Sequence, residues 1–352
     1  MDGVSGGLVR RVLEGPVDVI GDVHGEIGAL RALLGQLGYD DDGRHPQGRR
    51  AVFVGDLTDR GPDSPAVATL VMDRVERGHA QCVLGNHELN ILRREAKSGN
   101  AWIIDPTRRE QRPGGAYAHC KAAQEPFTAR FFAFIEALPL ALEREDLRIV
   151  HASWIPGEVD SLRTAQGSTL EVFNQHEQRV ESELAMEGLR ALADAERLEH
   201  KHALVTHGEV APPLLAAMAE CDARYQMGNP VRVATSGVER IARKPFWSAG
   251  QWRMVDRVPW WAEYHEATPV IVGHYWRRLA PFTGSGHAAH KPDLFGGVGP
   301  TDWLGPERNV FCVDYSVAAR SDGKLAKGNA PHGHLMAMRW PERELWGEEG
   351  MQ

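Results

Sequence analysis

Long apolar stretches are missing from this sequence of 352 residues. No window reaches the roughly 18 consecutive apolar residues of a membrane-spanning helix, and residues 1–15 lack the apolar segment of a secretory signal. Cysteine is also scarce, with four residues and no CxxC pair, which excludes a disulfide framework and a cysteine-based zinc site. We therefore expect a cytoplasmic protein without membrane contacts, in which the cysteines are small buried residues.

An excess of positive charge is absent as well. Lys and Arg number 40 against 48 Asp and Glu, which gives a formal net charge of −8. Proteins that bind nucleic acid broadly replace phosphate counterions with many Lys and Arg side chains. We expect no broad nucleic-acid binding here, although a local basic pocket is compatible with this charge balance.

Three apolar segments each end in a glycine that is followed by polar residues. The segments 17–20, 51–54 and 80–84 have the length and branching of buried strands. The polar clusters that follow them are GDVHG at 21–25, GDLTDRG at 55–61 and GNHE at 85–88. Helical spacing of apolar residues follows at 26–37 and again at 62–77. This alternation predicts a mostly parallel sheet whose polar clusters meet at one edge.

A single charged turn of this kind is also compatible with a solvated surface loop. Three of them in succession offer Asp, His, Asp, Asn and His, which are oxygen and nitrogen donors without thiolates. Such donors suit Mn²⁺, Fe or Zn²⁺ better than a soft metal. An aspartate shared by two ions about 3.5–4 Å apart is the arrangement of a two-metal hydrolase, and we expect that arrangement here.

The ordered motifs GDVHG, GDLTDRG and GNHE resemble the signature of the calcineurin-like metallophosphoesterases, in the bacterial type of their phosphoprotein phosphatase (serine/threonine phosphatase-like) branch. The resemblance implies an α/β sandwich of two sheets flanked by helices. It covers residues 16–154 and 268–347, which we expect to form the catalytic domain. Residues 155–267 form an insertion, helical at first and then rich in Trp, which we expect to be a cap or substrate-specificity region. Whether its tryptophans form a lid or a separate packing unit stays open.

The resemblance also implies six metal ligands, of which Asp56 bridges the two ions. These six are Asp22, His24, Asp56, Asn86, His151 and His274. One position has a competitor, because His207 follows a plausible strand at 203–205. We favour His274, since the strand at 270–272 is followed by Gly-His, the usual last ligand turn of the family.

Three further residues receive catalytic roles from the same resemblance. His87 would protonate the leaving group, with a plain hydrogen-bonding role as the alternative. Asp59 would orient His87, and Arg60 would clamp the phosphate with its forked NH groups. A hydroxide that bridges the two ions would attack phosphorus in line.

These expectations favour a metal-dependent phosphatase of phosphorylated proteins or small phosphoesters, with two Mn²⁺ ions as cofactors and Fe or Zn²⁺ as alternatives. Asp59 favours the protein phosphatase type. Symmetrical dinucleoside tetraphosphatases have a stretch similar to GDLVARG here, which often lacks an acid at the position of Asp59. The alternative is a bis(5'-nucleosyl)-tetraphosphatase or another nucleotide phosphohydrolase, with a base pocket in the insertion. A metal-stabilised binding module without turnover is a third interpretation.

Overall fold

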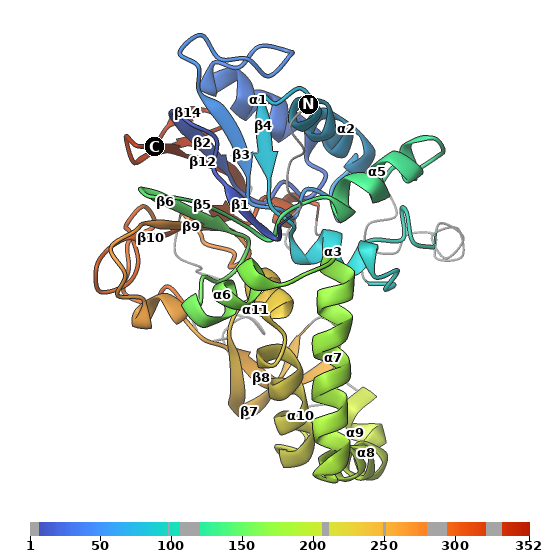
Figure 1. Cartoon of the computed structure of the whole chain (residues 1–352). Coiled ribbons are helices and arrows are strands. Elements are labelled where there is room, and N and C mark those ends of the chain that lie inside the picture. Colours follow the sequence, from blue (N-terminus) through green and yellow to red (C-terminus); the bar gives the residue numbers. More distant parts are fainter. Residues whose placement is uncertain are drawn as a thin grey trace.

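The computed structural model describes residues 7–97, 99–105, 120–205, 211–248, 251–279, 294–321 and 333–352. Two sheets stacked face to face form its upper part in Figure 1, and helices cover their outer sides. A group of helices with a two-stranded sheet extends below them. None of the helices described is long and apolar enough to cross a membrane.

The larger sheet has the strand order β14-β13-β12-β2-β3-β4, and β11 also pairs with β12. Strands β2, β3 and β4 run parallel, whereas β12 is antiparallel to β2. The strands are β2 (Val17–Ile20), β3 (Arg50–Phe53), β4 (Ala80–Cys82), β11 (Asp314–Tyr315), β12 (His334–Trp340), β13 (Glu344–Gly347) and β14 (Gly350–Met351). The three parallel strands confirm the predicted strand–helix alternation, with α1 (Ile27–Leu37) and α2 (Ser64–Glu76) between them.

The smaller sheet has the order β1-β5-β6-β9-β10. Its strands are β1 (Val9–Arg11), β5 (Ala141–Arg144), β6 (Leu147–Val150), β9 (Val270–Val272) and β10 (Val310–Cys312). Strands β6, β9 and β10 run parallel, although β6 and β9 are far apart in the sequence. This pairing brings the ends of both strands to the same edge, where two of the predicted ligands follow.

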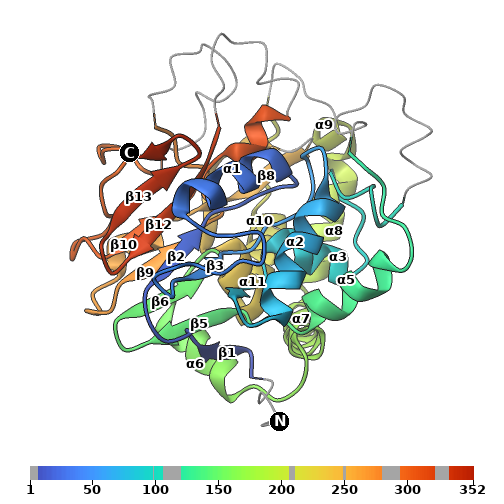
Figure 2. The ribbon, with the colours of Figure 1, turned by 90° about the horizontal axis from the view of Figure 1, so that it is seen from above.

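Apolar side chains fill the space between the two sheets. Val19 and Val52 of the larger sheet pack in one buried cluster with Ile149, Ile271 and Phe311 of the smaller sheet. The opposite faces of both sheets are covered by helices, as Figure 2 shows for α1 and α2 on one side and α6 (Pro156–Thr164) on the other. The predicted α/β sandwich is therefore confirmed, and its four cysteines are buried as expected.

One charged residue lies inside the larger sheet. Asp18 of β2 is fully buried, and its carboxylate accepts hydrogen bonds from Arg49 Nε at 3.0 Å, Arg339 Nε at 3.0 Å and Tyr39 Oη at 2.9 Å. A buried carboxylate is tolerated when cations and donors satisfy it in this way. The network ties β2, the start of β3 and β12 together at the end of the sheet opposite to the polar clusters.

Residues 155–267 form most of the lower part of Figure 1. Their elements are α6, α7 (Thr169–Met186), α8 (Leu189–Glu199), α9 (Lys201–Val205), α10 (Ala216–Met227), α11 (Pro230–Ser236), β7 (Glu239–Ser248), β8 (Gln251–Arg257) and a 3₁₀ helix at Trp260–Glu263. The helical stretch expected at 170–198 is broken at Gly188, which adopts φ 71°. The strand expected at 203–205 was wrong, because these residues continue the helical hairpin as α9.

The tryptophans of this region divide between two places. Trp260 and Trp261 are buried in the main core beneath the smaller sheet, and Trp260 Nε1 donates to the carbonyl of Ala152 at 3.1 Å. Trp247 and Trp252 face each other across the β7–β8 hairpin, with ring centroids 5.6 Å apart. The first pair thus contributes to the main core, whereas the second belongs to the projecting hairpin.

The remaining helices support the polar turns. Helix α3 (Asn86–Leu92) begins directly at the GNHE turn, and α5 (Phe127–Glu136) packs against α2 and α3. A short 3₁₀ helix spans Val317–Arg320. Before α3, Gly85 lies so close to the 55–61 loop that an added Cβ would overlap the main-chain nitrogen and carboxylate of Asp56. Only glycine permits this approach of the two loops.

We predict that Gly85→Ala destabilises the protein by about 1–3 kcal/mol, as overpacking does in a close-packed interior. It should also weaken metal binding, because the added methyl group displaces Asp56. Gly28→Ala is the matched control, since this exposed helical position has open space around its Cβ and alanine there should stabilise by about 0.5–1 kcal/mol. Urea unfolding measures both changes, and equal effects at the two positions would contradict the steric argument.

Candidate metal centre

The predicted site residues follow the carboxyl ends of five strands. Asp22 and His24 follow β2, Asp56 follows β3, and Asn86 begins α3 after β4. His151 and His274 follow β6 and β9 of the other sheet. The two sheets therefore contribute residues to one location at the end of the sandwich, as ligands do in open α/β folds.

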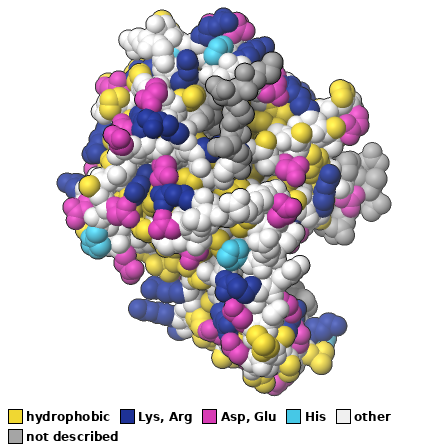
Figure 3. Space-filling model, in the orientation of Figure 1, with side chains coloured by type: hydrophobic (Ala, Val, Ile, Leu, Met, Phe, Trp, Pro, Cys, Tyr) yellow, Lys and Arg dark blue, Asp and Glu magenta, His cyan; other side chains and the backbone are white. Residues whose placement is uncertain are grey.

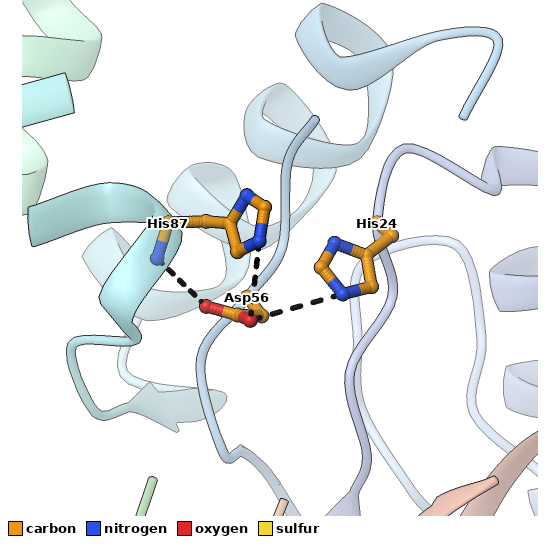
Figure 4. Close-up of side chains that lie close together, drawn as sticks. All are labelled: His24, Asp56 and His87. Atoms are coloured by element: carbon orange, nitrogen blue, oxygen red, sulfur yellow. Dashed lines mark hydrogen bonds and ion pairs between the residues drawn. The ribbon is translucent and has the colours of Figure 1, made fainter. Parts of the chain in front are cut away.

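The carboxylate of Asp56 lies at the centre of this group, and Figure 4 shows it together with His24 and His87. Its Oδ2 is 3.7 Å from Nε2 of His24 and 3.9 Å from Nε2 of His87. Its Oδ1 accepts a hydrogen bond from the main-chain N–H of His87 at 2.9 Å and lies 3.4 Å from Nε2 of His151. The two oxygens thus face two different groups of donors, as a bridging carboxylate requires.

The second group contains one amide and two imidazoles. Asn86 Oδ1 is 2.9 Å from Nδ1 of His274 and 3.1 Å from Nε2 of His151. His151, His274 and Asp56 each offer one ligand atom within a span that could hold a metal ion. His24, Asp56 and His87 form another such group, so Asp56 belongs to both.

Main-chain carbonyls orient two of the imidazoles. His24 Nδ1 hydrogen-bonds to the carbonyl of Thr58 at 3.0 Å, and His151 Nδ1 to that of Val54 at 2.7 Å. These contacts place the N–H on Nδ1 and leave the Nε2 lone pair directed at the site. Metal-binding histidines are commonly fixed in this manner by a neighbouring acceptor.

Several buried carboxylates crowd around the same point. Burial, and after it the charges of Asp314 and Asp56, raise the pKa of Asp22 well above its usual range. Burial and then Asp56 raise the pKa of Glu88 to about 7. Burial also opposes the ionisation of Asp56, but His151 and His87 outweigh it and hold the pKa of this carboxyl well below its usual range. Such a concentration of buried acids lacks enough positive charge and is matched to divalent cations.

The donor set therefore fits two hard or borderline ions. Asp22, His24 and Asp56 would hold the first, and Asp56, Asn86, His151 and His274 the second. Asp22 lies at the margin of the first group, with Oδ2 4.0 Å from His24 Nε2. It also accepts the main-chain N–H of His274 at 3.2 Å, which connects the two groups.

His87 and Asp59 lie together as expected. Nδ1 of His87 is 2.6 Å from Oδ2 of Asp59, and the indole Nε1 of Trp102 donates to Oδ1 of Asp59 at 2.6 Å. All three side chains are buried. Trp102 therefore fixes the carboxylate that in turn fixes the imidazole, which leaves Nε2 of His87 facing the site.

Arg60 contacts both imidazoles of the first group. It donates from Nη1 to His24 Nε2 at 3.1 Å and from Nη2 to His87 Nε2 at 3.0 Å. Its guanidinium also lies over the ring of Trp276, 5.0 Å from the centroid, in a cation–π contact. The Nε2 atom of His24 has a single lone pair, so its contact with Arg60 and its coordination of a metal exclude each other.

The turns around the site carry strained backbone. Six residues other than glycine adopt left-handed φ values between 45° and 73°: His24, Asp56, Asp59, Arg60, His274 and Trp276. Each such conformation costs about 1 kcal/mol or more and is characteristic of functional sites. The surrounding sandwich therefore holds these side chains in positions that the isolated turns would not favour.

Sequence reasoning missed four residues near the site. Trp102 and Asp314 belong to segments without a recognisable motif, and Trp276 stands two residues after His274 in the last ligand turn, where we assigned it no contact with the site. Asp314 accepts the main-chain N–H of Trp276 at 2.8 Å and thereby shapes the turn after β9. Burial lowers the pKa of His274, and the charge of Arg257 at the end of β8 lowers it further. The competing His207 lies outside the described residues.

The family model of the calcineurin-like phosphoesterases matches residues 15–230. The chain belongs to this family. The match includes the three motifs and extends well into the region that we expected to be an insertion. It agrees with the two-sheet fold and with the gathering of Asp, Asn and His residues at one end of the sandwich.

Curated relatives of the family match part of the chain. The bis(5'-nucleosyl)-tetraphosphatase PrpE (asymmetrical) of Geobacillus sp. (strain WCH70) is 37% identical over 142 residues, which cover 39% of this chain and 56% of that protein. The PrpE of Bacillus subtilis (strain 168) is 33% identical over 140 residues, which cover 38% and 56%. The chain thus spans about half the length of these curated relatives. Their name corresponds to the alternative function that we gave from the sequence, a bis(5'-nucleosyl)-tetraphosphatase. The protein phosphatase type is not confirmed.

Among solved structures, a putative diadenosine tetraphosphatase aligns with 96% of this chain and 95% of its own, at a TM-score of 0.43 and 15% identity. A cold-active protein-tyrosine phosphatase of a psychrophile, Shewanella sp., aligns with 98% of this chain and 81% of its own, at a TM-score of 0.42 and 16% identity.

We predict opposite effects of two substitutions on the metal-free protein. Because burial raises the pKa of Asp22, its ionised form opposes folding at pH 7, and Asp22→Asn should raise the melting temperature. The pKa of Asp56 is lowered, so its ionised form favours folding and Asp56→Asn should lower it. Thermal unfolding with a chelator measures both, and the exposed Asp41→Asn is the control. Both site variants should reduce the stabilisation that added Mn²⁺ provides. If Asp22→Asn lowered the melting temperature as much as Asp56→Asn, the opposite pKa shifts of the two carboxyl groups would not be the cause.

Metal content tests the choice of His274 over His207 as a ligand. His274→Ala should leave the protein with one ion instead of two, because Nδ1 of His274 lies beside Asn86 in the second group. His207→Ala and the exposed His265→Ala should retain two ions. Elemental analysis after loading with Mn²⁺ distinguishes these outcomes. Loss of an ion in His207→Ala alone would assign the ligand to the helical region instead.

Proposed function

We propose that this protein is a two-metal hydrolase of phosphoric esters and anhydrides, and that dinucleoside tetraphosphates are its first substrate class. The observation that carries the hydrolase is the division of the Asp56 carboxylate between two groups of buried donors. The names of the curated relatives support the nucleotide substrate. Manganese is the first ion to test, since the donors are oxygen and nitrogen atoms only.

Phosphomonoesters, including those of phosphorylated proteins, are the second candidate substrates. The contact between His87 and Asp59 supports them. An alkoxide leaves poorly without a proton, and a histidine with an ordered carboxylate partner supplies that proton. A nucleoside polyphosphate has a better leaving group and needs this assistance less.

Each polar group of the site has a role in this reaction. When bound, a pair of divalent cations supplies Lewis acidity and activates water for attack on phosphorus. Arg60 turns its forked donors to the phosphate oxygens and neutralises their charge. His87 keeps a proton on Nδ1 for Asp59 and delivers the proton on Nε2 to the leaving oxygen. Trp102 holds Asp59 in place, so that Asp59 and His87 are oriented before the substrate binds.

A substrate panel tests the proposed function. The protein is assayed with Mn²⁺ on diadenosine tetraphosphate, p-nitrophenyl phosphate and a phosphoserine peptide, before and after metal removal. We expect hydrolysis of all three, the highest kcat/KM on the tetraphosphate, and loss of activity on chelation that Mn²⁺ restores. Full activity in the chelated protein would overturn the two-metal assignment.

Leaving-group dependence tests the role of His87. General acid catalysis typically contributes about 10²–10⁴-fold, so His87→Asn should approach that loss on phosphoserine peptide. The loss on p-nitrophenyl phosphate should be much smaller, because nitrophenolate leaves readily without a proton. Arg60→Ala is the comparison variant, and it should lower both rates alike because both substrates share the phosphate. Equal losses for His87→Asn on both substrates, with metal content unchanged, would reassign His87 to a hydrogen-bonding role.

A further inference from the structure

A large cleft opens in the lower part of the molecule, beyond the metal centre. Its volume is about 1020 Å³, which is at the upper end for pockets that hold small-molecule ligands. The walls are formed by the end of α3, by α7 and α10, and by the β7–β8 hairpin. In Figure 1 α7, α10, β7 and β8 lie below α3.

Helix α3 connects the cleft to the metal centre. It begins with Asn86 and His87, and Arg93 directly after its last residue lines the cleft. At 1.5 Å per residue this short helix spans only about 10 Å. A substrate that reaches from the metal centre past α3 therefore arrives in the cleft.

Strand β8 makes the same connection from the other wall. Gln251, Arg253 and Val255 line the cleft from one face of the strand, because alternate residues share a face, and Trp252 lines it from beside the hairpin turn. Arg257 continues that face at the end of the strand, where its guanidinium lies 6.0 Å from the ring centroid of Tyr275, the neighbour of His274. A basic side chain thus stands between the metal centre and the cleft, at a place suited to a chain of phosphates.

The charges in the wall are nearly balanced. Arg232 forms two hydrogen bonds of 2.8 Å with the carboxylate of Glu177, and Arg93 donates to Glu95 at 2.9 Å. Positive and negative side chains also alternate over the face of the molecule drawn in Figure 3. The cleft is therefore suited to a neutral polar group rather than to a polyanion or a cationic side chain.

Two carboxylates in the wall can accept hydrogen bonds from a ligand. Asp222 of α10 and Glu239 of β7 are half-buried, and within the described residues neither accepts a hydrogen bond. Burial raises the pKa of both, and Arg253 acts on both in the opposite direction. Partly desolvated carboxylates of this kind are satisfied by O–H or N–H donors of a ligand.

An aromatic ring completes the wall. Trp252 lines the cleft, and its ring is held against Trp247 at an interplanar angle of 77°. An indole fixed in this way offers a surface on which a planar heterocycle stacks. The combination of an indole with two acidic acceptors matches the base and the hydroxyl groups of a nucleoside.

We propose that this cleft binds the nucleoside end of the substrate, with the base against Trp252 and the ribose hydroxyls donating to Asp222 and Glu239. The inference rests on the proposed function, because the phosphate chain leads from the metal centre to the cleft. A peptide next to a phosphorylated residue is the competing occupant. Four arginines and five acidic residues line the wall, so it has almost no net charge with which to attract a basic or an acidic peptide.

Binding of adenosine tests the cleft without reference to catalysis. Calorimetric titration of the metal-loaded protein with adenosine should detect one site, and Trp252→Ala and the double variant Asp222→Asn/Glu239→Gln should weaken it at least tenfold. Trp252→Phe should retain most of the affinity, because it keeps an aromatic face. Glu220→Gln is the matched control on α10, since Glu220 does not line the cleft. Absence of adenosine binding to the wild-type protein would overturn the proposal.

Kinetics separates the cleft from the metal centre. Since stacking of a base contributes about 1–3 kcal/mol, Trp252→Ala should lower kcat/KM on diadenosine tetraphosphate about 10- to 100-fold, mostly through KM. Its effect on p-nitrophenyl phosphate, which has no nucleoside, should be at least tenfold smaller. Equal losses on both substrates, or a selective loss on a phosphopeptide, would overturn the proposal while leaving the hydrolase intact. A wild-type protein that binds adenosine but hydrolyses no phosphoester would instead overturn the proposed function alone.

Discussion

The arrangement of the site depends on one buried carboxylate, that of Asp56. Its side-chain oxygens face the two donor groups, and its main-chain carbonyl accepts the N–H groups of Val23 and His24 at 3.0 and 2.9 Å. Oδ1 also accepts the N–H of His87, at the start of α3. The three polar turns of the larger sheet therefore meet at this residue. Displacing it would move donors from both groups at once, because each turn is positioned through its contacts with the others.

Holding these groups together opposes the stability of the fold. Left-handed backbone at six positions and the buried acids Asp22, Asp314 and Glu88 are unfavourable in the absence of cations. The closely packed layer between the two sheets and the Asp18 network at the opposite end of the strands compensate for this cost. Rigidity at one end of the sandwich thus permits strain at the other, which is the usual trade between stability and activity.

The parts that could be predicted from the sequence are those encoded locally. A buried strand, a glycine and a polar cluster stand next to one another in the chain, so the turns at Asp22, Asp56 and Asn86 were recognisable. The supports of these turns were not, because Trp102 reaches Asp59 and Trp276 reaches Arg60 only through packing between distant segments. The strand expected at 203–205 failed for a related reason. A short apolar run carries no information on whether its neighbours pair with it in a sheet or continue a helical hairpin.

The same distinction between local and long-range information bears on substrate choice. The motifs define the turns of the metal centre, whereas the cleft is assembled from side chains as far apart in sequence as Arg93 and Val255. The chain from Asp22 to Val255 is longer than the 142 residues aligned with the Geobacillus tetraphosphatase. Similarity of that extent therefore cannot include both the metal centre and the whole cleft wall. Chemistry can be shared with such relatives through the turns alone, whereas the nucleoside preference that we propose would come from Trp252, Asp222 and Glu239 in this chain itself.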